Sequence, residues 1–313
     1  MARLIRPTTL VTSLLLVAAT AVAASTTSAE NVAVSSSRDH PLKATPAPGR
    51  RGRIVGGRPV DDLDESTGVH FIAKLFTRDD GFYCGGTVVS DYPHVLTRAG
   101  CSPQVGDIVR LGGARLFDGL VTRVRAVAVH HKYNPVGDVA DVAVLTLEKV
   151  KPWKLRRAGV LPATLNKKWD NPHGLYLTGY GATDKAAQSA GSLQLKRGYL
   201  PVASWTHCRK ITDAIRVPGL SRVGLPINPN AQVCLWGSNR SGALCERDVG
   251  GPMFRVKNRK INHNGQTETV RVYELYAISS FWIATTNERC PQGMPNIGSK
   301  VAEYYYWIQG QMK

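Results

Sequence analysis

Residues 94–104 read HVLTRAGCSPQ. The stretch from His94 to Thr97 has the composition of a buried strand, and it runs directly into a loop that carries Cys101. Glycine stands at position 100, so the residue before the cysteine has no side chain. The segment predicts a buried strand that leads into a cysteine loop.

The chain has 313 residues, enough for one large domain or two small ones with a sizeable core. Lysine and arginine outnumber aspartate and glutamate by 40 to 23. This excess favours anionic partners such as sulfated glycans, nucleic acid or acidic membranes, and it carries no information about the fold.

The N-terminus MARLIRPTTLVTSLLLVAATAVAAS has two arginines, then an apolar run from Leu10 to about Ala19, then small residues that end at Ala23. This order predicts a secretory signal peptide over residues 1–23. The alternative is a membrane anchor, but the apolar run is shorter than the roughly 20 residues that a span requires. We therefore expect a secreted, extracellular protein with no membrane span and no nucleic-acid partner.

Residues 24–53 are rich in Ser, Thr, Ala and Pro and contain no aromatic residue. Such a segment cannot bury enough apolar surface to offset the entropy of ordering it, so we expect a flexible pro-segment. It ends in RRGR, directly before IVGG. Arg53–Ile54 is therefore a candidate cleavage bond, and Arg50 with Arg53 gives the R-x-x-R spacing that furin-type convertases favour.

Six cysteines in a secreted chain favour a disulfide framework over a metal site. Their spacing alone leaves 15 pairings open. The chain has neither Cys-x-x-Cys nor a close Cys/His cluster, so we expect no zinc or other metal, and no cofactor.

After Ile54 the sequence shows many short β-like runs separated by Gly, Pro and Asn turns, among them residues 68–76, 82–90, 141–148 and 274–282. This pattern favours an all-β antiparallel sandwich or barrel. Only the final stretch, VAEYYYWIQGQMK, has a helical pattern.

Seven segments resemble the chymotrypsin/trypsin family of serine proteases in order and spacing: RIVGG at 53–57, CGGTVVS from Cys84, VLTRAGC ending at Cys101, DVAVLTL from Asp141, LTGYG at 177–181, CERDVGGP from Cys245, and YYYWIQ near the end. The resemblance covers nearly all of residues 54–313. It implies two six-stranded Greek-key β-barrels with a C-terminal helix. It also implies the disulfides Cys84–Cys101, Cys208–Cys234 and Cys245–Cys290.

The family's chemistry needs a hydroxyl nucleophile, an imidazole base and an orienting carboxylate. Where the family has serine in GDSGGP this chain has Val249, and where it has histidine in LTAAHC this chain has Gly100. Asp141 alone remains, so no catalytic residue is expected. His94, His130 and His131 are not placed to replace the base, and Ser280 is expected to bond the Asp141 carboxylate.

Two further elements of the family's site also differ. Arg247 stands where a glycine supplies an oxyanion-hole amide, and its side chain disfavours the positive φ that glycine adopts. Ala243 replaces the aspartate at the floor of the specificity pocket. Trp282 or Ile283, together with Asn296, replace the small residues of the pocket walls, so we expect a filled pocket.

Asp248 matches the aspartate that, in the family, pairs with the new amino terminus after cleavage. Two interpretations stay open: a cleavage-driven switch kept without catalysis, or inherited packing. Asn239 begins an N-R-S sequon on the loop before Cys245 and is a candidate glycosylation site.

Basic residues gather in two runs, KVKPWKLRR and RVKNRK. Such runs are usually solvated surface, and the alternative is a surface that binds a sulfated glycan or another polyanion. The residues concerned are Lys149, Lys151, Lys154, Arg156, Arg157, Arg255, Lys257, Arg259 and Lys260.

The sequence thus predicts a secreted serine protease homologue without catalysis, which acts by binding. The resemblance implies a regulator or cofactor in an extracellular fluid, such as an immune protease cascade or seminal fluid. Its partner would be an active protease, an inhibitor or a receptor. Two alternatives remain: a heparin-binding effector, and an atypical serine hydrolase with relocated catalytic groups.

Overall fold

The structure is a computed structural model, and it describes residues 55, 57–60, 69–92, 94–135, 139–152, 154, 162–182, 191–213, 227–236, 243–263, 266–285 and 287–313. All of them belong to one compact unit, Asn31–Lys313. The predicted signal peptide, the predicted pro-segment and the bond Arg53–Ile54 lie outside the described residues, as do Arg156, Arg157 and Asn239.

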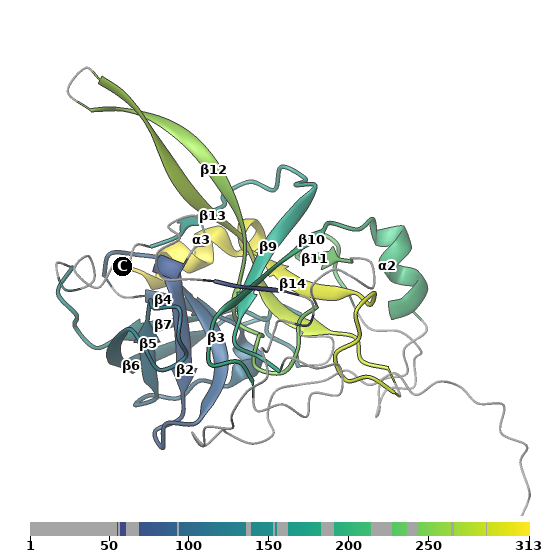
Figure 1. The fold of residues 1–313 in the computed structure, drawn as a ribbon, viewed down its shortest axis with the longest axis horizontal. Helices are drawn as coiled ribbons and strands as arrows, with labels where there is room; N and C mark the ends of the chain where they lie inside the picture. The colour runs from purple at the N-terminus through teal and green to yellow at the C-terminus, as the bar shows by residue number, and fades with distance from the viewer. Residues whose placement is uncertain are drawn as a thin grey trace, which may run out of the picture. The chain divides into compact units, whose positions relative to one another are not determined.

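Six strands form a closed antiparallel barrel in the order β2-β3-β4-β7-β6-β5. They are β2 (Ile72–Phe76), β3 (Phe82–Val88), β4 (His94–Thr97), β5 (Ile108–Leu111), β6 (Leu120–Val129) and β7 (Ala143–Leu147). Strand β4 pairs with β7, although β5 and β6 come between them in the sequence. This order is that of a Greek key. The first barrel therefore confirms the predicted architecture (Figure 1).

Eight strands form the second sheet, in the order β1-β10-β9-β12-β13-β14-β11, with β8 paired to β13. They are β1 (Arg58–Pro59), β8 (Thr164–Leu165), β9 (Gly174–Gly179), β10 (Lys196–Pro201), β11 (Gln232–Leu235), β12 (Pro252–His263), β13 (Gln266–Trp282) and β14 (Asn296–Lys300). The all-β prediction is confirmed, and this sheet curls as a half-barrel whose two ends, β10 and β11, meet only in a short contact. A single bridge between Val202 and Leu235 connects the end of β10 to β11.

In the part of the chain that the structure describes, two α-helices and two short 3-10 turns accompany the strands. The C-terminal helix α3 (Val301–Gln311) buries Val301, Tyr304 and Ile308, which lie on one face at helical spacing. A second helix, α2 (Trp205–Thr212), begins after Ser204, whose side chain accepts a hydrogen bond from the His207 amide. The sequence pattern did not predict α2, because its only buried residues are Cys208 and Thr212.

The segments before and after the former nucleophile position connect the two sheets. The amide of Gly85 in β3 donates to the Val249 carbonyl at 2.9 Å, across the two sheets. A Cβ on Gly85 would lie 3.0 Å from the Gly251 backbone, so the close approach favours glycine at position 85. The sheets are therefore held together at the place where the family's catalytic groups meet.

Three disulfides join Cys84–Cys101, Cys208–Cys234 and Cys245–Cys290, the pairs that the resemblance implies. Among the helices that the structure describes, none has the length and apolar composition of a membrane span. Nor do the described side chains include a cluster of three or more His, Cys, Asp or Glu groups suited to a metal ion.

Candidate functional site

Asp141 lies just before β7 and is fully buried. One carboxylate oxygen, Oδ1, accepts a hydrogen bond of 2.7 Å from the Gly100 amide. The other oxygen, Oδ2, accepts a short hydrogen bond from the Ser280 hydroxyl in β13. The expected bond between Ser280 and Asp141 is therefore present, and the two sheets meet at this carboxylate.

Arg98 is the third partner of Asp141. Its Nε lies 2.7 Å from Asp141 Oδ2, and both side chains are fully buried. The guanidinium lies over Gly100: a Cβ on Gly100 would be 2.7 Å from the guanidinium carbon and 2.8 Å from Nε. The arginine thus occupies the space into which a side chain at position 100 would extend, and it supplies the positively charged donor that pairs with Asp141.

The histidines considered as substitutes lie elsewhere. His94 is in β4 opposite Thr146, and its Nδ1 is within 2.9 Å of Ser90 Oγ and of the Tyr92 carbonyl oxygen. His130 packs against the rings of Tyr304 and Trp307 in α3. Neither histidine is among the Asp141 partners described above, so no imidazole among the described side chains pairs with the carboxylate.

Val249 occupies the nucleophile position and is fully buried within the apolar core. Arg247, two residues earlier, has φ of +71°. The resemblance placed a glycine there because that conformation disfavours side chains, yet this chain keeps the left-handed turn with an arginine. The left-handed conformation at position 247 is therefore present, while the side chain at the nucleophile position is apolar.

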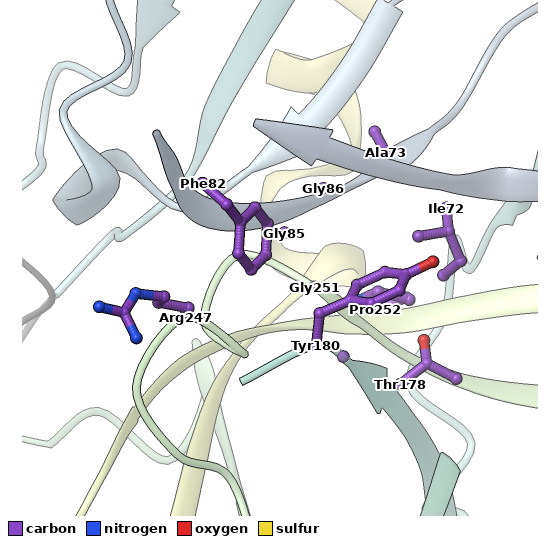
Figure 2. A pocket seen from close by; sticks show the side chains of 11 residues that line it. Ile72, Ala73, Phe82, Gly85, Gly86, Thr178, Tyr180, Arg247, Gly251 and Pro252 are labelled. Carbon is purple, nitrogen blue, oxygen red and sulfur yellow. The ribbon is translucent and has the colours of Figure 1, made fainter. Parts of the chain in front are cut away.

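A small hollow lies beside this loop, lined from both sheets by residues such as Ile72, Phe82, Tyr180 and Arg247. Figure 2 shows the Phe82 and Tyr180 rings beside the hollow and the Arg247 guanidinium directed away from them. Its volume of about 10 Å³ is close to the space that one water molecule requires. It is far too small for a peptide side chain.

Buried side chains stand at the positions that the resemblance assigns to the specificity pocket. Trp282 and Ala243 are buried in the same apolar cluster as Val249, and the Trp282 indole donates to the Arg289 carbonyl at 2.6 Å. Asn296 Oδ1 accepts the Leu244 amide at 2.8 Å. Trp282 and Ile283, the two candidates for the pocket wall, are both buried. An arginine or lysine of a substrate would meet packed apolar groups in place of a carboxylate.

Asp248 is buried and accepts hydrogen bonds from the amides of Gly181, at 2.7 Å, and Cys245, at 3.1 Å. Burial raises the pKa of its carboxyl to about 7, and the two amide bonds lower it by less. Val55, which directly follows Ile54, is buried, and its carbonyl accepts the Ala243 amide at 3.0 Å. The chain next to the candidate cleavage bond is thus already inserted beside the pocket floor.

The two basic runs differ in how their cations are used. Lys149, Lys151 and Lys154 are exposed. In the second run, Arg255 and Lys257 are half-buried, and Lys257 pairs with Glu274 at 2.5 Å and with Asp170 at 3.3 Å. Arg259 and Lys260 are exposed. The second run is therefore not one continuous charged face.

The family profile "Trypsin" matches residues 54–308. The chain belongs to the trypsin family. A trypsin of Saccharopolyspora erythraea is 28% identical over 271 residues, which span 83% of this chain and 98% of that protein. Glucanase inhibitor protein 3 of Phytophthora infestans is 26% identical over 248 residues, spanning 76% of this chain and 81% of its own.

Among solved structures, this family member is similar to neuropsin, a serine protease expressed in the limbic system of mouse brain. The TM-score is 0.61 over 82% of this chain and 99% of the neuropsin chain, at 22% identity. At that identity the likeness concerns the fold.

Sequence reasoning missed Arg98. A signal was present, because the family pattern LTAAHC has alanine where this trypsin-family chain has Arg98, in the same segment that loses the histidine. A long cation two residues before a glycine in a buried segment predicts a partner of opposite charge, and Asp141 is that partner.

Proposed function

We propose that this protein is a secreted, noncatalytic member of the trypsin family that acts by binding, as a regulator or cofactor of other proteins in an extracellular fluid. The observation that carries the proposal is the buried Arg98–Asp141 ion pair over Gly100. It gives the orienting carboxylate a permanent partner that cannot serve as a base, since a guanidinium stays protonated in proteins.

Two further features support the proposal. Val249 offers neither a proton nor a lone pair for nucleophilic attack. Trp282 belongs to the buried apolar core at the position of the pocket wall. Its packing stabilises the fold at a place where an active enzyme keeps an open site for substrate. The changes thus lie in the groups that perform chemistry, whereas the three disulfides keep the scaffold and fit an oxidising, extracellular compartment.

The similarity to glucanase inhibitor protein 3 also supports a binding role, since that relative is named for inhibition of another enzyme. Within this proposal the partner is an extracellular protein, such as an active protease, an inhibitor or a receptor. Cleavage at Arg53–Ile54 would place the new amino terminus next to the inserted Val55 and give Asp248 a cationic partner. Detection by mass spectrometry of secreted chains that start at Ile54 tests this step.

Activity is tested with a serine-directed fluorophosphonate probe and a panel of peptide substrates, applied to the full chain and to protein cleaved at Arg53–Ile54. Active trypsin is the positive control. We expect neither labelling nor hydrolysis. Labelling of a serine in the cleft of the wild-type protein would show an atypical hydrolase and overturn the proposal.

Stepwise restoration separates the missing groups from the filled pocket. The G100H/V249S double variant should stay inactive, because Arg98 occupies the imidazole space. The R98A/G100H/V249S triple variant regains the nucleophile, the base and the free carboxylate, so we expect slow labelling by the probe. It should still not cleave peptides at Arg or Lys, because Trp282 remains. Ready cleavage by either variant would refute the role assigned to Arg98 or to the pocket.

A further inference from the structure

Strands β12 and β13 form a ribbon that continues beyond the sheet. Their pairing runs from Pro252 opposite Ile278 to His263 opposite Gln266. The neighbouring strand β9 pairs with β12 only at Met253 and Phe254. Figure 1 shows the two strands extending away from the remaining strands of the sheet. The distal part of the ribbon, residues 256–263 with 266–273, therefore has two strands.

In the distal part of the ribbon, the outer edge of each strand is not paired within the described residues. On the β13 side, pairing with β14 begins at Ala277, and pairing with β8 involves only Glu274 and Leu275. An unpaired edge presents backbone N–H and C=O groups that accept another extended chain. The ribbon thus offers two such edges, and their side chains decide which chain fits.

The root of the ribbon is fixed by charged and aromatic contacts. Lys257 bridges Glu274 and Asp170, and the Tyr276 hydroxyl donates to Asp170 at 2.7 Å. The Arg255 guanidinium carbon lies 5.9 Å from the Tyr276 ring centroid. These two cations of β12 are engaged within the molecule, so they orient the ribbon and are not free for a partner.

The distal part of β12 carries Arg259 and Lys260, both exposed. As neighbours in a strand they point to opposite faces. Their cross-strand partners, Val270 and Thr269, are uncharged, and β12 has no acidic residue between Pro252 and His263. The outer edge of β12 therefore presents backbone groups with one cation on each side, whereas β13 carries Glu268 beside its own edge.

We propose that the outer edge of β12, at residues 258–262, binds an extended acidic segment of an extracellular protein by strand addition. Backbone hydrogen bonds give the affinity, and acidic side chains on successive residues of the added strand reach Arg259 on one face and Lys260 on the other. The proposal deepens the binding function proposed above and rests on it only in naming the partner as a protein.

The arrangement favours a peptide over the other occupants. A sulfated glycan binds a row of cations on one face, but on the Arg259 face Arg255 and Lys257 are already engaged. A second copy of this chain would place two cationic edges together, and charged residues on a free edge are a common protection against such pairing.

The test uses a fluorescent eight-residue peptide of Glu, Thr and Val, in which glutamates lie on both faces of the extended chain. Its binding to the full-length protein is measured by fluorescence anisotropy. We expect saturable binding that weakens with salt. The R259S/K260S variant should bind about tenfold more weakly. The matched control K149S/K151S loses two exposed cations in the segment that follows β7 and should bind as the wild type does.

Strand addition has a signature that charge alone lacks, because only one edge of the peptide pairs with β12. Two peptides of the same sequence are N-methylated on alternate residues, one at odd and one at even positions. One set should abolish binding and the other should not. Equal binding by both sets, or equal loss in R259S/K260S and K149S/K151S, would overturn the proposal.

Two other results would also overturn it. Binding of a heparin oligosaccharide that depends on Arg259, with none of the peptide, would assign the edge to a glycan. Self-association that R259S/K260S abolishes, seen in sedimentation, would assign it to a second copy. Each of these failures is distinct from failure of the noncatalytic function, which only the fluorophosphonate probe and substrate panel address.

Discussion

Replacement of Arg98 and Gly100, singly and together, tests whether the arginine has taken the place of the imidazole. Arg98→Ala removes the ion-pair partner of a fully buried carboxylate, and loss of one member of such a pair costs about 3–5 kcal/mol. Gly100→His places a side chain within the guanidinium, since even its Cβ would lie 2.7 Å from the guanidinium carbon. Because displacement of the arginine breaks the same pair, we expect a similar loss.

The double variant R98A/G100H should be more stable than either single variant. The alanine vacates the space, and the imidazole N–H then donates to Asp141. The two changes would sum to about 6–10 kcal/mol if they were independent, so recovery to within about 2 kcal/mol of the wild type requires a coupling larger than the usual 0.5–3 kcal/mol between contacting residues. The sign of that coupling is the essential prediction.

Denaturant unfolding followed by tryptophan fluorescence measures the four free energies of the cycle. In thermal melts each kcal/mol corresponds to about 2–4 °C for a domain of this size, so the single variants should melt about 6–20 °C lower. The control R98A/G100A vacates the same space without an imidazole. It should recover much less than R98A/G100H, because Asp141 keeps no cationic or imidazole partner.

Additive losses in the cycle would refute the reasoning, since they would mean that Arg98 and position 100 do not compete for one space. Equal recovery in R98A/G100A and R98A/G100H would also refute it, because steric relief alone would then explain the coupling.

Three further outcomes are expected. Burial and the neighbouring His131 and Lys132 charges lower the pKa of His130. The unfolding free energy should therefore fall as pH drops below about 6.5 and level off below the folded-state pKa. In a series of denaturant titrations at different pH, His130→Phe should remove this dependence. Burial raises the pKa of Asp248 to about 7. In uncleaved protein the unfolding free energy should therefore fall by up to about 4 kcal/mol as pH rises from about 4 to about 7. Asp248→Asn should remove that slope, and cleavage at Arg53–Ile54 should reverse it, because the new ammonium favours the charged carboxylate. Trp282→Gly should cost about 3–5 kcal/mol in calorimetric unfolding, since it leaves a cavity in the core; a loss below about 1 kcal/mol would contradict the packed pocket.

The long ribbon shows where sequence patterns were insufficient for the fold. Residues 252–256 and 274–282 have the alternation of strands, and they form the ribbon's root. The charged stretch between them has the composition of solvated surface, although it continues both strands. Its strand conformation is stabilised by cross-strand pairing and by the Lys257 contacts, which a reading of local composition does not contain.

In the candidate site, too, one part could be predicted from the sequence and another could not. The losses at Gly100 and Val249 are read directly from the sequence, since the chemistry of a residue type is a local property. The role of Arg98 was not, because Arg98 follows β4 whereas its partner Asp141 precedes β7, and only the pairing of these strands in the closed barrel brings the two side chains to 2.7 Å.

The sequence by itself determined the trypsin-family β-architecture, the presence of Gly100 and Val249 where the family has histidine and serine, and the set of cysteines, because these follow from strand periodicity, turn residues and side-chain chemistry. Only the tertiary structure decided that the second sheet curls as a half-barrel whose ends meet in a single bridge, that α2 forms, and that the Arg98 guanidinium lies over Gly100. It also decided which basic residues are engaged and which are exposed. These features depend on contacts between residues far apart in the chain, whose energies arise when burial removes water from both partners at once.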